Sequence, residues 1–259
     1  MKSLLLVALL VPAVASAQGH PIDGTWKIDV ASAKFPEKPE QILLKDGRYS
    51  CSTCVPPYDV KSDGTDQAVA GSKYRDTVAV KIVDQHTVQF SSKKDGKVVS
   101  EGTTTVSADG EMMTEAFKSY PPAGQPVTGK VTSQRVAKGP AGSHAVSGSW
   151  RATKAADFSD SGLTVTFKST PDGLTMTAPT GESYDAKFDG KDYPIKGDRG
   201  GSMVSLKKVD ERTVEETTKR DGKVVGVARI AVAPDGTTLN FAYDDKERGT
   251  TMTYQAKKQ

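Results

Sequence analysis

The sequence of 259 residues contains little cysteine, little histidine and few aromatic side chains. It has two Cys, three His and 7% aromatic residues, and the His lie far apart, at positions 20, 86 and 144. A protein zinc site needs three or four ligands of these types close together. We therefore expect no bound metal.

The sequence also lacks the short motifs that mark common catalytic and nucleotide-binding sites. It contains no Gly-x-Ser-x-Gly elbow, Walker loop, Gly-x-Gly-x-x-Gly fingerprint or His-Glu-x-x-His pair. We therefore expect no enzyme activity, no catalytic residue and no cofactor. The net charge is only +3, from 35 basic and 32 acidic residues that are interspersed along the chain. Without a basic stripe, nucleic acid is not an expected partner.

Long apolar runs are absent except at the N-terminus. Lys2 precedes an apolar run from Leu4 to Ala15, and Ala15-Ser16-Ala17 supplies the small residues that a signal peptidase reads. A run of about a dozen apolar residues is too short to cross a bilayer as a helix. The pattern predicts a cleaved signal peptide at 1–17 and a periplasmic or secreted protein that is not membrane-integral.

An internal duplication is the strongest pattern in the rest of the chain. Residues 46–113 align without a gap on 172–239, with 24 identical positions of 68. Upstream, Gly24-Thr25-Trp26-Lys27 matches Gly148-Ser149-Trp150-Arg151. The duplication predicts two repeats, at 20–138 and 145–259, joined by a linker at 139–144 that is rich in Gly and Pro.

Each repeat has the pattern of an all-β domain. Nine Asp-Gly pairs separate short runs rich in Val and Thr. Asp-Gly favours the type I′ turn of a β-hairpin, and Val and Thr favour strands. We predict that each repeat is a small antiparallel up-and-down β-barrel of about 8–10 short strands, because closure removes exposed strand edges. A two-sheet sandwich is the alternative.

The two Gly-x-Trp motifs, each followed by a series of hairpins, resemble the first strand of the calycin-like superfamily of lipocalins and fatty-acid-binding proteins. In that family the Trp closes one end of the barrel and is often packed by an Arg from the last strand. The resemblance implies lipocalin-like barrels closed by Trp26 and Trp150, with Arg135 stacked on Trp26. The position that matches Arg135 in the second repeat is Tyr254 or a neighbour.

The repeats also resemble a group of uncharacterised exported bacterial proteins. These combine the Gly-Thr-Trp-Lys start with a later Asp-Gly-Lys-Asp-Tyr-Pro motif, which here occupies 189–194. This resemblance covers most of both repeats and implies no particular activity.

Cys51 and Cys54 are the only cysteine pair. In an extended strand they would lie about 10 Å apart, but a tight turn at Ser52-Thr53 would bring them within disulfide distance. In an oxidising compartment we expect a disulfide that locks this turn. A redox-active pair is expected at a helix N-terminus, and a zinc site would need two further ligands.

One hairpin in each repeat supplies candidate ligand-binding residues. With a two-residue loop at Asp221-Gly222, Glu216 should face Val227 and lie diagonal to Arg229, and the equivalent hairpin should pair Phe90 with Glu101. If this face lines a cavity, Glu101, Glu216 and Arg229 would anchor a ligand there beside Phe90. The alternative is a solvated charge pattern on the outer surface.

These patterns lead to two hypotheses about function. The first is a non-catalytic periplasmic binding protein that holds a small, largely apolar ligand inside one or both barrels, by analogy with the fold. The second is an envelope scaffold or protein-interaction module with filled barrels, whose partner is another envelope protein.

Overall fold

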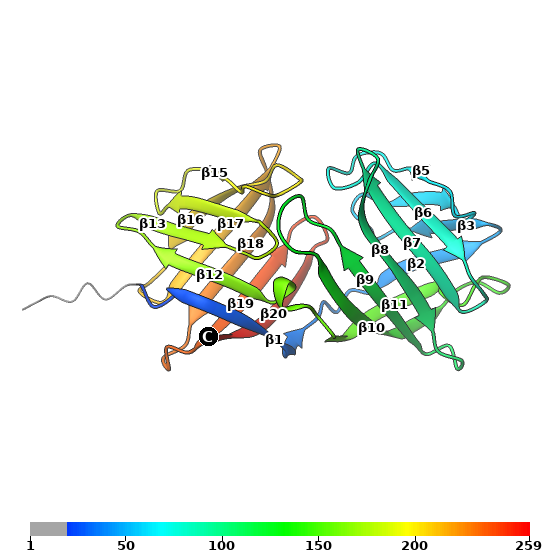
Figure 1. Cartoon of the computed structure of the whole chain (residues 1–259). Coiled ribbons are helices and arrows are strands. Elements are labelled where there is room, and N and C mark those ends of the chain that lie inside the picture. The colour runs from blue at the N-terminus through cyan, green and yellow to red at the C-terminus, as the bar shows by residue number, and fades with distance from the viewer. Residues whose placement is uncertain (1–19) are drawn as a thin grey trace, which may run out of the picture.

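The computed structural model describes residues 20–259, so the predicted signal peptide at 1–17 lies outside the described residues. The described chain is all-β apart from the short 3-10 helix η1 (Asp160–Gly162). Two ten-stranded antiparallel sheets each curve into a nearly closed barrel, and the two barrels lie side by side (Figure 1). This confirms the predicted fold class. No helix between residues 20 and 259 has the length and apolar character that a membrane span requires.

We call the two barrels the host barrel and the inserted barrel. In sheet order, the host barrel contains β14 (Ser183–Lys187), β13 (Gly173–Thr177), β12 (Thr164–Ser169), β1 (Gly24–Lys34), β20 (Thr250–Lys258), β19 (Thr238–Asp245), β18 (Lys223–Val232), β17 (Thr213–Arg220), β16 (Met203–Lys208) and β15 (Tyr193–Pro194). The inserted barrel contains β4 (Tyr58–Lys61), β3 (Arg48–Cys51), β2 (Glu40–Lys45), β11 (Gly148–Ala156), β10 (Val127–Lys138), β9 (Met112–Ser119), β8 (Lys97–Val106), β7 (Thr87–Lys94), β6 (Thr77–Ile82) and β5 (Gln67–Ala68).

The first strand of each repeat belongs to the barrel built from the rest of the other repeat. Strand β1 pairs with β12 and β20, whereas β11 pairs with β10 and β2. The inserted barrel is therefore one continuous segment, 40–156, placed between β1 and β12 of the host barrel. The chain crosses between the barrels at 35–39 and at 157–163.

This topology corrects the predicted domain boundaries. The ranges 20–138 and 145–259 mark the sequence repeats, but neither range is a complete barrel. The predicted linker at 139–144 lies in the connection between the paired strands β10 and β11. Local hydrogen bonds from Ser143 N–H to Pro140 O and from Ser147 N–H to His144 O fold this connection back, so that β11 pairs with the strand just before it.

The Asp-Gly pairs form two kinds of turn. At Asp46, Asp95 and Asp221 both the Asp and the following Gly have positive φ, as the predicted type I′ hairpin turn requires. At 63, 109, 189 and 235 only the Gly has positive φ, and the Asp carboxylate accepts a hydrogen bond from the backbone N–H two residues on. The type I′ prediction is therefore right for three of the nine pairs, and four others are Asx-turns.

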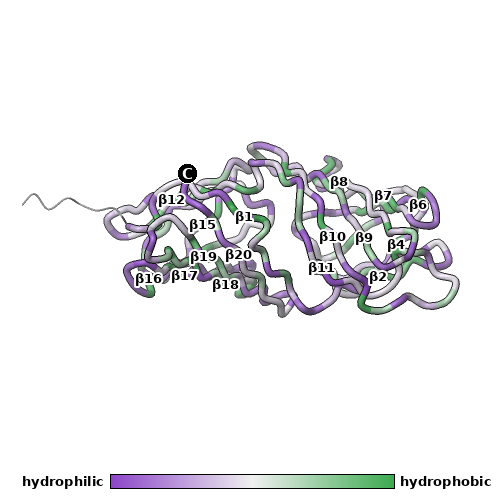
Figure 2. Tube along the Cα trace, turned by 90° about the horizontal axis from the view of Figure 1, so that it is seen from below, coloured by the Kyte–Doolittle hydropathy of each residue, from purple (hydrophilic) through white to green (hydrophobic). Residues whose placement is uncertain are grey.

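A buried Trp occupies equivalent places in the two cores. The indole N–H of Trp26 donates to Ile22 O at 2.7 Å, and that of Trp150 donates to Val146 O at 2.8 Å. Apolar residues alternate with hydrophilic ones along the strands around them (Figure 2). Both Trp side chains are at most 1% exposed, in agreement with a packing role.

The cation that packs on each Trp differs from the expected one because the first strands are exchanged. The Arg135 guanidinium lies 3.9 Å from the ring centroid of Trp150, and Lys258 Nζ lies 5.3 Å from that of Trp26. The predicted contact between Arg135 and Trp26 is therefore wrong, and the counterpart of Arg135 is Lys258 and not Tyr254. Arg135 also donates to the backbone carbonyls of Ala145 and Ser147, which fixes the β10–β11 connection.

Candidate functional site

A β-bulge in each predicted ligand-binding hairpin changes which residues face one another. The extra residues are Val99 in β8, opposite Ser92 and Lys93, and Val225 in β18, opposite Thr218 and Lys219. Each adds one residue to one strand and shifts the pairing by one. Glu216 consequently faces Ala228, not Val227, and Phe90 faces Gly102, not Glu101.

The four predicted site residues therefore divide between the two faces. Phe90 lines the interior of the inserted barrel, and Glu216 lies inside the host barrel, where it accepts a hydrogen bond from Tyr184 Oη. Glu101 and Arg229 are exposed on the outside, and Glu101 accepts a hydrogen bond from Tyr120 Oη. The structure does not bring these four residues into one site.

The inserted barrel has a partly open cavity of about 280 Å³. Apolar side chains of β6, β7 and β9 form part of its wall, and charged and hydroxyl groups form the rest. The lining residues are Glu40, Ile42, Tyr49, Cys54, Tyr58, Arg75, Val78, Val80, Val88, Phe90, Ser92, Ser100, Thr104, Met113, Glu115, Phe117, Ser119 and Arg248. Arg248 comes from the β19–β20 turn of the host barrel, so both barrels contribute to the site.

Two carboxyl groups face this cavity. Burial and, to a smaller extent, the nearby charge of Glu40 together raise the pKa of Glu115 to about 7. Burial also raises the pKa of Glu40, although the charge of Arg248 partly opposes this. In the described part of the chain neither carboxyl forms an ion pair with a basic side chain. A cationic group of a ligand placed here would favour the ionised form of both carboxyls.

Arg75 and two tyrosines form another part of the wall. The rings of Tyr49 and Tyr58 stack with centroids 6.1 Å apart, and the Arg75 guanidinium lies 5.2 Å from the Tyr58 centroid. The Nε of Arg75 is buried and has no hydrogen-bond partner. Burial raises the pKa of both tyrosines, which keeps their hydroxyls protonated.

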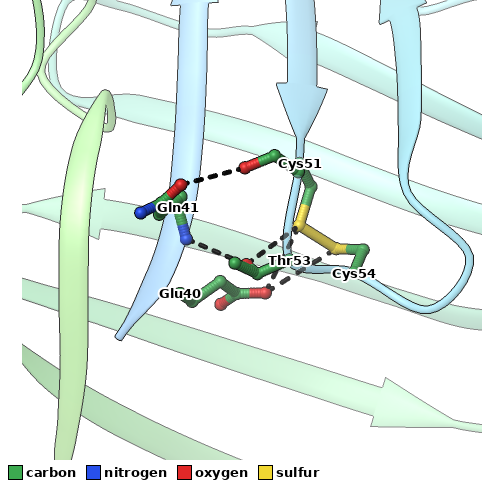
Figure 3. Close-up of a disulfide and its surroundings, with 6 residues drawn as sticks. Glu40, Gln41, Cys51, Thr53 and Cys54 are labelled. Carbon is green, nitrogen blue, oxygen red and sulfur yellow. Dashed lines mark hydrogen bonds between the residues drawn. A yellow bond between two sulfur atoms is a disulfide. The ribbon is translucent and has the colours of Figure 1, made fainter. Parts of the chain in front are cut away.

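The Cys51–Cys54 disulfide lies at the edge of the cavity. The two Cα atoms are 5.4 Å apart, so the predicted disulfide across a tight turn is present. Glu40 Oε1 lies 3.6 Å from Cys51 Sγ and 3.7 Å from Cys54 Sγ, and Gln41 N–H donates to Thr53 Oγ1 (Figure 3). These contacts hold the turn against the start of β2. Because each sulfur is bonded to the other, this group of Glu40, Cys51 and Cys54 offers no thiolate to a metal.

Aromatic side chains occupy the equivalent region of the host barrel. Phe241 stacks on Tyr254 with ring centroids 4.5 Å apart, and these residues correspond to Glu115 and Val131 of the inserted barrel. Conversely, Glu216 corresponds to Phe90. The two barrels therefore have the same strand arrangement, but the host barrel has a pair of stacked rings where the inserted barrel has a carboxyl group and a smaller Val.

Glu216 should make the stability of the host barrel depend on pH. Burial raises its pKa from 4.5 to about 7, although the hydrogen bond from Tyr184 opposes this. The protonated form is therefore favoured on folding. This contribution is fully present below about pH 4.5 and is lost as the pH rises through 7, at a cost of at most about 3 kcal/mol. We expect Glu216→Gln to reduce the fall in unfolding free energy between pH 5 and pH 8, as measured by chemical denaturation.

The exposed Glu101→Gln is the matched control for this experiment, and it should leave the pH dependence as in the wild type. If the unfolding free energy falls equally with pH in the wild type and in Glu216→Gln, Glu216 does not titrate in this range.

Sequence reasoning missed the four charged residues of the cavity, Glu40, Arg75, Glu115 and Arg248. For the first three, the duplication contains a usable signal. Arg75 aligns with Gly201 and Glu115 with Phe241, and Glu40 faces Trp150 where Val165 faces Trp26. A charged residue that replaces an apolar residue or Gly in only one of two barrels points to a local role that the fold itself does not require.

Comparisons with protein-family models, with curated proteins and with solved structures find no match to this chain.

Proposed function

We infer that this protein is a non-catalytic binding protein, exported to the periplasm or secreted, and that it holds a small ligand inside the inserted barrel. The observation that carries this inference is the cavity of about 280 Å³ in a barrel whose duplicate has the stacked Phe241–Tyr254 pair at the equivalent positions. Protein interiors normally pack densely, and ligand sites combine apolar walls with a few placed polar groups. The lining of this cavity has that mixed character.

The size of the cavity limits the ligand. Small-molecule sites usually measure about 300–1,000 Å³, so a cavity of about 280 Å³ favours a small ligand. Such a ligand is smaller than a fatty acid or a typical lipocalin cargo. The carboxyl groups, Arg75 and the hydroxyls also favour a partly polar ligand over the largely apolar one that the sequence suggested.

Filling the cavity with the residues of the host barrel should abolish binding. The double variant Glu115→Phe/Val131→Tyr places the stacked pair of the host barrel at the equivalent positions. We expect at least a hundredfold loss of affinity for the ligand that co-purifies with the wild type, measured by calorimetry after the ligand has been removed. Gln134→Tyr, on the outer face of the same strand β10, is the control and should bind normally. Unchanged binding by the double variant would place the ligand elsewhere.

Native mass spectrometry of protein purified from its own cells tests the proposed function itself. A small molecule at one copy per chain, released on denaturation, would support a binding protein and reveal the ligand. A bare protein mass together with a recovered envelope protein would instead favour the scaffold hypothesis.

A further inference from the structure

Four charged side chains line the cavity. Arg75 lies in the connection between β5 and β6, Glu40 at the start of β2, Glu115 in β9 and Arg248 in the β19–β20 turn. Arg75 packs on the Tyr58 ring, whereas the charge of Glu40 raises the pKa of Glu115 and that of Arg248 lowers the pKa of Glu40. The charge of Arg75 lowers the pKa of Tyr49 and Tyr58, while the two carboxylates raise it. The charges of Arg75, Glu40 and Glu115 therefore all act on both tyrosines.

The surroundings of Arg75 favour the binding of an anion. Its guanidinium packs on the Tyr58 ring, its Nε is buried without a partner, and in residues 20–259 it forms no ion pair. A buried donor without a partner is costly, and a guanidinium binds a carboxylate through two parallel hydrogen bonds. A ligand carboxylate would satisfy Arg75 without any change of the fold.

Glu40 and Glu115 are equipped to receive a cation. The two carboxyls share the cavity wall, and neither is neutralised by a Lys, Arg or His side chain in an ion pair. A ligand ammonium group at this place would donate hydrogen bonds to both carboxylates and offset their mutual repulsion. Glu40, Arg75 and Glu115 have no charged counterpart in the host barrel.

We propose that the cavity selects a small zwitterion, with a carboxylate on Arg75 and an ammonium group between Glu40 and Glu115. This rests on the proposed binding function and specifies the ligand class. A small aliphatic amino acid has both charges and fits the volume of the cavity. Its side chain would lie against the apolar wall formed by residues such as Val80, Val88 and Phe90.

A matched series of four compounds tests the proposal by calorimetry on the full mature chain. Leucine carries both charges, 4-methylpentanoate carries only the carboxylate, 3-methylbutylamine carries only the ammonium group, and 3-methylbutanol carries neither. We expect leucine to bind at least tenfold more tightly than each of the other three compounds.

Two variants test which protein residue binds each charge of the ligand. Arg75→Gln should weaken the binding of leucine and 4-methylpentanoate at least tenfold and leave 3-methylbutylamine unaffected. Glu115→Gln should weaken the binding of leucine and 3-methylbutylamine and leave the binding of 4-methylpentanoate unaffected. Arg48→Gln, an exposed Arg that pairs with Asp59 outside the cavity, is the control for loss of a positive charge. Thermal unfolding of each variant establishes that it is folded.

The outcomes separate this proposal from the binding function on which it rests. If 3-methylbutanol binds as tightly as leucine, or if neither cavity variant changes the preference, the zwitterion proposal fails and the binding function stands. If no compound of the series binds, the molecule that co-purifies with the protein tests the proposal. A co-purified ligand that lacks a carboxylate or an ammonium group overturns it. If nothing binds and nothing co-purifies, both fail.

Discussion

A fragment that spans 40–156 is expected to fold by itself into the inserted barrel. It contains all ten strands of that sheet, the buried Trp150 with its Arg135 partner, and the Cys51–Cys54 disulfide. Because no strand of this sheet comes from outside the fragment, its core loses little when the host barrel is removed. We expect a cooperative unfolding transition and a buried Trp fluorescence spectrum.

The fragment for comparison is 20–138, the first sequence repeat. It lacks β11 and carries β1 in its place, so its sheet must be completed by a strand that belongs to the host barrel in the intact chain. We expect this fragment to be clearly less stable than 40–156. A disordered 40–156 beside a well-folded 20–138 would contradict the strand exchange.

Replacing Trp26 by Ala is expected to damage the barrel formed mainly by the second repeat, although Trp26 lies in the first. Trp26 is fully buried in the host core, and its indole N–H donates to Ile22 O. Loss of a buried Trp costs about 3–5 kcal/mol of unfolding free energy. Hydrogen exchange measured by mass spectrometry should therefore increase in β12 to β20 and remain unchanged in β2 to β10.

Trp150→Ala is the matched variant in the inserted barrel, and it should give the reverse pattern. Its effect should lie in β2 to β11, because Trp150 belongs to the core of that barrel. Increased exchange of β2 to β10 in Trp26→Ala would mean that each repeat closes on its own first strand.

The fold class could be predicted from the sequence because it depends on local patterns that recur. Asp-Gly turns, Val- and Thr-rich strands, and two Gly-x-Trp motifs each specify a few neighbouring residues, as does the Cys51–Cys54 turn. The strand exchange could not be predicted in this way. The sequences around Trp26 and Trp150 are nearly equivalent, so each first strand has a pattern that suits either barrel.

The candidate site was predicted less well, because a single extra residue in a strand changes which side chains face the cavity. The extra residue, Val99 or Val225, moves every side chain beyond it to the opposite face. The prediction therefore placed Glu101 beside Phe90, although the two lie on opposite faces. Arg75 lies in an irregular connection, where strand periodicity carries no information about direction.

The insertion of one barrel into the other also sets an order of events during synthesis. The pairing partner of Trp26 in β20 is Lys258, which lies at the other end of the chain, whereas every strand of the inserted barrel is available once residue 156 has emerged. Contacts between distant parts of a chain form slowly, and proteins of this size fold unit by unit as they are made. We therefore expect the inserted barrel to fold first, while β1 can pair with β12 soon afterwards but gains its second partner, β20, only at the end of synthesis.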